Sequence, residues 1–446
     1  MQYTEIGKTW MKLTLVSGHA RRDKSFRFTS LAHLLDAEYL RDCYGSLNRD
    51  KAVGIDNISW KDYGADLEKN LTGLVARLKS RKYKPLPARR VYIPKSETEK
   101  RPLGISALEN KIVERGIANI LGSIYEEDFL DCSYGFRPGR SCHQALKKLN
   151  ELIVNRPTNH IVEADIKGFF DNVDHELLLD FIRIRIADPS LLTLIGRFLK
   201  AGYVDSGLLE TPESGTPQGS ILSPILANIF LHYVLDEWFE TTVKNHSNGF
   251  CELVRYADDF VCTVQYGDDA ERIEKALKHR FEKYGLEIHP EKSRKFSFGR
   301  YEKVNADKQN RRANSFDFLG LTHYCAASRE GKFKVGRKTS RKKFAGKCRD
   351  MNEWLKAIRN QVRTKEWWKI LASKLRGHFQ YYGVSENYAG ISRFYKQTLR
   401  MTHKWLNKRS QKRKMSWAKF QSYLKHYPLP QPKIVHSFYD GKCTVS

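Results

Sequence analysis

Apolar side chains recur every three to four residues through the N-terminal part of the chain, which is the spacing of one face of an α-helix. Residues 51–56 interrupt this pattern, include Gly54 and are predicted to form a loop. We therefore predict a mostly helical N-terminal region over residues 1–78. The positions that carry the helical spacing are Leu31, Leu34, Leu35 and Leu40, and then Leu67, Leu71, Leu74 and Leu78.

The pattern changes from residue 79 onwards. Residues 89–94 and 101–105 are short apolar runs bounded by proline, glycine and polar residues, which favours strands. The first run is predicted to be an edge strand, because a proline within a strand cannot donate to a neighbour. Apolar positions at helical spacing then predict a helix over residues 111–124.

Strand-like and helix-like runs alternate between residues 160 and 325. One predicted helix extends from about Ser223 to Phe239, with Pro224 in the first turn, where a missing N–H is tolerated. The whole stretch over residues 79–325 is therefore predicted to be an α+β domain.

The last part of the chain is again helical in pattern. Residues 326–340 are polar, basic and glycine-containing, and are predicted to link two domains. Residues 326–446 are predicted to form a separate basic helical domain. Its apolar positions at helical spacing are Phe344, Cys348, Met351, Leu355 and Ile358, and then Ile391, Phe394, Tyr395, Thr402, Trp405 and Leu406.

The distribution of charge predicts a binding partner. The chain has 78 Lys and Arg against 51 Asp and Glu, and residues 331–446 hold 29 of these cations with only 5 acids. A region this basic favours a polyanion such as nucleic acid, through phosphate contacts and counterion release. A disordered basic tail is the alternative, but the region is rich in aromatic residues, which build a core and can stack on bases.

The sequence disfavours membrane, secreted and zinc-binding proteins. No apolar run approaches the length of about 18 residues that a membrane span needs, and the N-terminus lacks the apolar core of a signal peptide. The eight cysteines form no C-x-x-C pair, so we expect reduced thiols and no structural zinc site. We therefore expect a cytoplasmic protein of bacterial type, associated with the nucleoid and with no membrane partner.

Three carboxylates carry the strongest chemical signal. Asp258 and Asp259 are adjacent between two apolar runs, which predicts a strand, a tight turn and a second strand. Asp165 ends another strand-like run upstream. An Asp-Asp pair alone is usually a solvated hairpin tip, but three converging carboxylates are suited to holding two Mg²⁺ ions for in-line attack on a phosphate. The pattern favours nucleotidyl transfer.

Several motifs in the same order and spacing extend this signal, and together they resemble the reverse transcriptases encoded by group II introns. The resemblance implies a right-hand polymerase with mixed fingers, a palm built on an antiparallel sheet, and an α-helical thumb or maturase domain. It implies an RNA-directed DNA polymerase that uses an RNA template, a DNA primer and deoxynucleoside triphosphates. The matching segments are residues 51–56, 91–95, 100–105, 133–141, 164–172, 215–220, 255–259 and 375–382.

The resemblance also implies roles for the acids. Asp165 and Asp258 would bridge both Mg²⁺ ions, and Asp259 would assist as a weaker or outer ligand. The backbone carbonyl of Ile166 would complete the metal site.

Further residues are assigned to the incoming nucleotide. Lys95 and Arg101 would contact the triphosphate, with a surface charge pair as the alternative, and the backbone amides of Gly168 and Phe169 could hold phosphate oxygens. Phe170 would be the ribose gate that excludes a 2′-hydroxyl, with a place in the core as the alternative.

For a last group of residues, the functional role has an ordinary structural role as its alternative. Gln218 and Gly219 would let the template–nucleotide pair approach, or form a plain turn. Lys292 would be a general acid for pyrophosphate, or a solvated lysine. His175 is predicted to make a structural hydrogen bond. Phe318, Leu319 and Gly320 would form the primer grip, or a buried strand end; RNA-binding cations would be Arg376, Arg393, Lys396, Arg400 and Lys404.

Three hypotheses for function remain open. The first is a polymerase that also binds group II intron RNA and assists splicing and mobility. The second is an RNA-binding protein that acts only in splicing, which the three intact acids disfavour. The third is a relative detached from its intron and used in DNA repair or defence. Without paired cysteines, we expect the compact form that lacks an H-N-H endonuclease domain.

Overall fold

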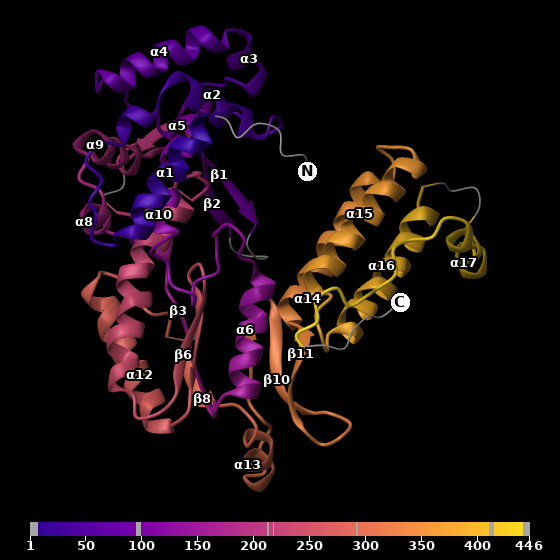
Figure 1. The fold of residues 1–446 in the computed structure, drawn as a ribbon. Coiled ribbons are helices and arrows are strands. Elements are labelled where there is room, and N and C mark those ends of the chain that lie inside the picture. Colours follow the sequence, from indigo (N-terminus) through magenta and orange to yellow (C-terminus); the bar gives the residue numbers. More distant parts are fainter. Residues whose placement is uncertain are drawn as a thin grey trace.

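The computed structural model describes residues 8–94, 100–211, 214–216, 218–290, 293–409 and 414–439. Figure 1 shows three regions: helices at the N-terminal end, a central body with sheets, and a group of C-terminal helices beside it. The architecture is mixed, with largely antiparallel sheets and many helices, in agreement with the predicted α+β class.

The N-terminal helices pack on α5 (Leu108–Tyr125), whose apolar face is buried. The predicted helix through Leu31 and Leu40 is wrong. Asp36 ends a short turn and accepts from the N–H of Tyr39 at 2.9 Å, so a new helix begins there. The elements of this region are α1 (Lys8–Arg22), η1 (Ala32–Leu34), α2 (Ala37–Ser46), α3 (Trp60–Ala65) and α4 (Leu67–Lys79).

The first sheet has the strand order β2-β1-β4-β5. The prediction that β1 is an edge strand is wrong, because Ala88 and Arg89 pair in parallel with Tyr203 and Val204 of β4. The pairing with β4 covers only the start of β1, so residues 90–94 lack this neighbour, and Pro94 lies where proline is tolerated. The bounds are β1 (Ala88–Pro94), β2 (Lys100–Ile105), β4 (Tyr203–Asp205) and β5 (Leu208–Glu210).

The second sheet has the order β6-β7-β3-β8 and is antiparallel throughout. Helices α6 (Cys142–Asn155) and α12 (Gly267–Lys283) lie on either side of it (Figure 1). Buried residues such as Ile161, Val254 and Phe260 fill both interfaces. The strands are β3 (His160–Asp165), β6 (Cys251–Tyr256), β7 (Asp259–Val264) and β8 (Arg294–Ser297).

The helices between β3 and β6 bury most of their apolar residues against α5 and this sheet. The predicted helix from Ser223 to Phe239 is longer than expected and irregular. It contains two π-turns, in which the N–H of Glu237 bonds to the carbonyl of His232 and the N–H of Lys244 to that of Phe239. The elements are α7 (Phe169–Asn172), α8 (His175–Arg185), α9 (Pro189–Leu199), α10 (Ser223–Leu231), η2 (His232–Asp236), η3 (Phe239–Val243) and α11 (Lys244–His246).

Residues 326–340, predicted as a linker, instead form most of a β-hairpin. Strand β11 pairs with β10 along its whole length, and Val335, Arg337 and Thr339 of β11 are buried in alternation. Arg337 reaches Asn150 of α6 and lies over the ring of Phe438. The elements are α13 (Glu302–Lys308), β9 (Ser315–Phe318), β10 (Leu321–Ala327) and β11 (Phe333–Thr339).

The C-terminal helices share an aromatic core that includes Trp367, Trp368 and Phe394, which accounts for the many aromatic residues of this basic region. The segment at residues 434–438 packs against this core. His436 forms an isolated parallel β-bridge with Val384, and its ring stacks on His143 of α6 at 3.6 Å between ring centroids. The helices are α14 (Arg341–Ile358), α15 (Thr364–Tyr382), α16 (Tyr388–Asn407) and α17 (Trp417–His426). Over the described residues, the helices are too short or too polar to cross a membrane.

Candidate active site

The three predicted acids meet at one end of the antiparallel sheet. Asp165, the last residue of β3, lies directly opposite Asp259, the first residue of β7. Residues so paired point to the same face, with side chains in reach of one another. Tyr256 pairs with Asp259, so Ala257 and Asp258 form a two-residue hairpin loop between β6 and β7. The register thus brings all three acidic residues to the same end of the sheet.

A buried arginine holds this loop. Arg255 is 0% exposed and donates to both carboxylate oxygens of Asp236, from Nε at 2.7 Å and from an Nη at 2.5 Å. It also donates to the backbone carbonyl of Ala257, to Asn228 and to Ser133. Ala257 has a φ of 58°, which is strained for a residue with a side chain. Arg255 therefore fixes the unusual backbone that positions Asp258.

Gly135 supports the same loop from behind. A Cβ at Gly135 would lie 2.3 Å from the backbone nitrogen of Ala257, so only glycine allows this approach. Asn228 donates to the Gly135 carbonyl at 2.8 Å. The segment around residue 135, one of the segments that match the family, thus packs against the hairpin loop. Its partners Arg255, Asp236 and Asn228 had no predicted role.

The ionised form of Asp258 is disfavoured by its surroundings in the site. Burial raises the pKa of Asp258, and the charge of Asp165 raises it further, while Arg101 and Arg255 lower it. Among the described residues, no three His, Cys, Asp or Glu side chains lie close enough together to hold a metal ion. The backbone thus brings the acids to one place, with their side chains not yet converged on a common point.

Phe169 and Phe170 face different environments. Phe169 is 2% exposed and contacts Phe230 in the core. Phe170 is half-buried and lines a cavity of about 350 Å³. Gly168 precedes them with a φ of 57°, and the two rings contact each other edge to face at 5.3 Å between centroids. Of the two aromatic residues, Phe170 is therefore the one placed to contact a ligand.

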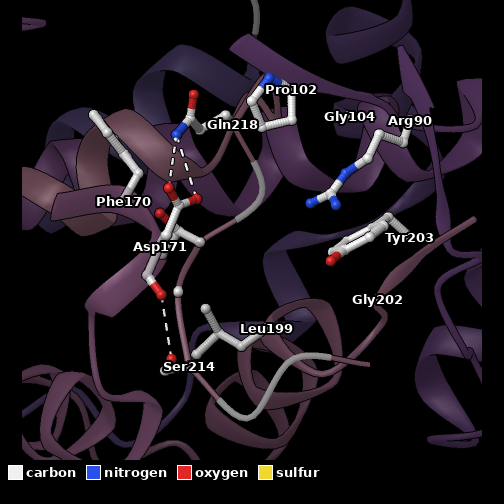
Figure 2. A pocket seen from close by; sticks show the side chains of 12 residues that line it. Arg90, Pro102, Gly104, Phe170, Asp171, Leu199, Gly202, Tyr203, Ser214 and Gln218 are labelled. Carbon is white, nitrogen blue, oxygen red and sulfur yellow. Dashed lines mark hydrogen bonds between the residues drawn. The ribbon is translucent and has the colours of Figure 1, made fainter. Parts of the chain in front are cut away.

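Figure 2 shows this cavity, with Phe170, Asp171 and Gln218 on one side and Arg90 and Tyr203 across from them. The Gln218 amide donates to the Asp171 carboxylate at 3.3 Å and 3.4 Å. The guanidinium of Arg90 lies 3.2 Å from the Tyr203 ring centroid. The cavity therefore has a polar wall and a cationic, aromatic wall.

The loop that carries Gln218 and Gly219 is fastened to the first sheet. The N–H of Gly104 in β2 donates to the Gln218 carbonyl at 2.6 Å. Gly219 has a φ of 111°, and a Cβ there would lie 2.6 Å from the Gly104 carbonyl oxygen. Buried Glu114 of α5, also without a predicted role, accepts from the Ile221 N–H at 2.8 Å.

His175 makes the predicted structural hydrogen bond. Its Nε2 lies 2.6 Å from the carbonyl oxygen of Gly215. This bond fixes the start of the same loop against α8.

Two predicted residues, Lys95 and Lys292, lie outside the described residues. Arg101 is exposed on β2, within electrostatic reach of Asp258. The segment on either side of Lys292 contacts the acid site: the N–H of His289 donates to the Asp165 carbonyl at 2.8 Å, and Ser293 Oγ accepts from the Asp165 N–H at 3.1 Å.

The predicted primer grip forms the tight turn between β9 and β10. Leu319 and Gly320 both have positive φ, at 49° and 76°, as in the two-residue type I′ turns of hairpins. The hydroxyl of Tyr381 on α15 donates to the Leu319 carbonyl at 3.1 Å. Phe318 is the last residue of β9 and is buried, as is Leu319, so this segment has the buried strand end expected as the alternative. The bond to Tyr381 also connects the turn to the C-terminal helices.

The predicted RNA-binding cations are all exposed. They lie on α15 and α16, and two of them lie over aromatic rings: Arg393 over Phe344 and Lys404 over Trp405. These residues are Arg376, Arg393, Lys396, Arg400 and Lys404.

Comparison with known proteins assigns the class. Residues 93–323 match the profile of the reverse transcriptase (RNA-dependent DNA polymerase) family. These residues include the acid hairpin, the Gln218 loop and the primer-grip turn. The chain therefore belongs to the reverse transcriptase family.

Individual relatives refine this assignment. Protein YkfC of Escherichia coli K12 is 35% identical over 281 residues, which cover 55% of this chain and 73% of YkfC. The group II intron-encoded protein LtrA of Lactococcus lactis subsp. cremoris is 40% identical over 222 residues, covering 49% of this chain and 37% of LtrA. A 91 kDa protein in the cob intron of Schizosaccharomyces pombe is 41% identical over 167 residues, covering 37% of this chain and 20% of that protein. The predicted resemblance to group II intron reverse transcriptases and maturases is confirmed by these relatives.

Proposed function

We propose that this protein copies RNA into DNA by two-metal nucleotidyl transfer at Asp165, Asp258 and Asp259. The observation that carries the proposal is the cross-strand pairing of Asp165 with Asp259 beside the loop that presents Asp258. In this proposal the β6-β7-β3-β8 sheet is the floor of a polymerase palm, the β1–β2 hairpin belongs to the fingers, and α14–α17 form the thumb.

The donor set fits Mg²⁺. Carboxylate and carbonyl oxygens are the ligands this ion prefers, and the raised pKa of Asp258 reflects burial and negative charge that a cation would offset. Asp165 and Asp258 would hold both ions, with Asp259 and the Ile166 carbonyl assisting. When bound, the ions would lower the pKa of the primer 3′-hydroxyl and neutralise the triphosphate.

Protein groups would position the substrate. Arg101, exposed near Asp258, would hold the triphosphate together with Lys95 and the amides of Gly168 and Phe169. Gln218 and Gly219, fastened to β2, would form the surface under the template–nucleotide pair. Lys292 would donate a proton to pyrophosphate, and Phe318, Leu319 and Gly320 would hold the primer strand.

Phe170 would exclude ribonucleotides by contact with a 2′-hydroxyl. We expect Phe170→Ala to reduce the preference for dCTP over CTP by at least about tenfold, because a cavity that loses bulk no longer rejects one extra hydroxyl. The ratio of kcat/KM for the two nucleotides measures this, and Phe170→Tyr, which keeps the ring, should retain the preference. An unchanged ratio in Phe170→Ala would return Phe170 to a role in the core.

The exposed cations of α15 and α16 would bind RNA by contacts to phosphates. This RNA would be the template, and also group II intron RNA whose splicing and mobility the protein would assist. Because its primer would be DNA, the protein would act in the cytoplasm, in association with the nucleoid.

The proposal is tested by primer extension on an RNA template with deoxynucleotides. We expect the wild-type protein to extend the primer, EDTA to abolish extension, and added Mg²⁺ to restore it. A folded protein that binds RNA tightly but extends no primer under any of these conditions would instead support the splicing-only hypothesis.

A further inference from the structure

The turn between β9 and β10 has both of its loop carbonyls held by the C-terminal region. In a two-residue hairpin loop, these carbonyls point away from the ladder and need partners from outside the hairpin. The Leu319 carbonyl accepts from the Tyr381 hydroxyl of α15 at 3.1 Å. The Gly320 carbonyl accepts at 3.1 Å from the N–H of Ser340, which directly precedes α14. The position of this turn therefore depends on elements that follow it in the chain.

The backbone of the turn also needs this support. Leu319 has a φ of 49°, which is unfavourable for a residue with a side chain. A Cβ added at Gly320 would lie 3.3 Å from the hydroxyl oxygen of Tyr382, so Tyr382 packs directly on the turn. Two consecutive tyrosines of α15 thus contact two consecutive residues of the turn, and Tyr381 supplies the hydrogen bond.

Tyr381 is tied to the acid site by a second route. Its backbone carbonyl oxygen lies 2.9 Å from Nε2 of His143 in α6, and the two rings meet edge to face at 5.8 Å between centroids. Helix α6 packs on β6 and on β7, the strand that begins with Asp259. Burial raises the pKa of Tyr381, and the charge of Asp259 adds to this effect, so the hydroxyl stays protonated and remains a donor.

A displaced turn would affect the chemical step more than binding. The primer 3′-hydroxyl reacts when it lies about 3–3.5 Å from the phosphorus under attack, and a misplacement of about 1 Å can cost about a hundredfold in rate. Affinity for a primer–template, in contrast, comes mostly from phosphate contacts spread over a basic surface. A residue that places the turn should therefore control the rate constant of nucleotide addition and leave affinity nearly unchanged.

We propose that Tyr381 is a positioning residue for the primer 3′ end: through its bond to the Leu319 carbonyl, it sets where the turn holds the primer terminus relative to the three acids. The inference rests on the proposed function, because it takes this turn as the primer grip. It extends that function by giving control of the chemical step to a residue of α15, outside the residues 93–323 that match the family profile.

Tyr381→Phe isolates the hydroxyl. It keeps the ring against His143 and removes only the donor to the Leu319 carbonyl. We expect the full-length variant, bound in advance to an RNA template and a DNA primer, to add one deoxynucleotide about tenfold more slowly than wild type. The Kd for the primer–template should change by less than about twofold. The amplitude of the single-turnover reaction, which counts active complexes, should stay the same.

A fluorescent primer terminus reports its position without any synthesis. When 2-aminopurine is the last primer base, opposite uracil in the template, a firmly held terminus stays stacked and its emission is low. We expect Tyr381→Phe to raise the emission of the bound complex in the absence of deoxynucleotides. If the wild type binds the primer–template but extends no primer, the proposed function fails, and this emission still decides whether Tyr381 positions the terminus.

Tyr395→Phe is the matched control, since the Tyr395 hydroxyl accepts from the Gln431 amide at 2.9 Å within the same C-terminal region. Each variant loses one hydrogen bond, so both should lower the unfolding midpoint by a similar small amount. Tyr395→Phe should nevertheless keep the wild-type rate constant and emission. An unchanged rate constant or emission in Tyr381→Phe, an equal change in Tyr395→Phe, or a loss confined to the amplitude would overturn the positioning role.

Discussion

Asp258→Ala should abolish primer extension on an RNA template while leaving RNA binding nearly intact. The variant removes a carboxylate that would hold both metal ions, and no other described acid lies in the hairpin loop to replace it. We expect synthesis to fall by at least about a thousandfold, the scale of losing a main source of transition-state stabilisation. Single-turnover extension beside an RNA-binding titration measures both effects.

Stability gives this prediction an internal control. Burial and the charge of Asp165 raise the pKa of Asp258, so the ionised carboxylate lowers the free energy of unfolding and does not add to it. Removing it should therefore not lower the midpoint of unfolding. Asp268→Ala, which removes an exposed acid at the start of α12, should keep full synthesis. Substantial extension by Asp258→Ala would refute the metal assignment.

The second large effect is expected at the buried pair of Arg255 and Asp236. Arg255→Met leaves the Asp236 carboxylate buried without its partner, and breaking such a pair costs about 3–5 kcal/mol of unfolding free energy. It also removes the donor to the Ala257 carbonyl, so the loop that presents Asp258 should lose its geometry. We expect lower stability in urea and loss of synthesis together.

A double variant separates these two consequences. Arg255→Met with Asp236→Leu replaces both charges by apolar groups, which is often close to neutral for stability. Much of the stability should return, but not synthesis, because the bond to Ala257 is still missing. Arg183→Met, which breaks an exposed pair with Asp180, should cost less than about 1 kcal/mol. Full synthesis by the double variant would show that Arg255 serves stability alone.

Features set by neighbouring residues were predictable from the sequence. The strand, turn and strand around Asp258 and the helices α4, α5, α14 and α16 follow from local periodicity and turn residues.

Features set by distant partners were not predictable. The interior position of β1 depends on β4, more than a hundred residues later. Strand β11 was taken for a linker because it is basic, yet Arg337 is buried through contacts with Asn150 and Phe438, which no local pattern reveals. The support that Arg255 gives to the hairpin loop likewise depends on Asp236, on a different element.

The first π-turn, at His232–Asp236, restricts how the helix that begins at Ser223 can change in length. Because it bonds residue 237 to residue 232, it holds one residue more than an α-helical turn, and both His232 and Asp236 face the core. Loss of one residue here could leave a regular helix, yet each residue turns the helix by about 100°, so Asp236 would rotate away from Arg255. A single-codon deletion in this segment should therefore be as damaging as loss of Asp236 itself, because either change leaves Arg255 without its partner, and the length of the segment should persist among descendants of the gene.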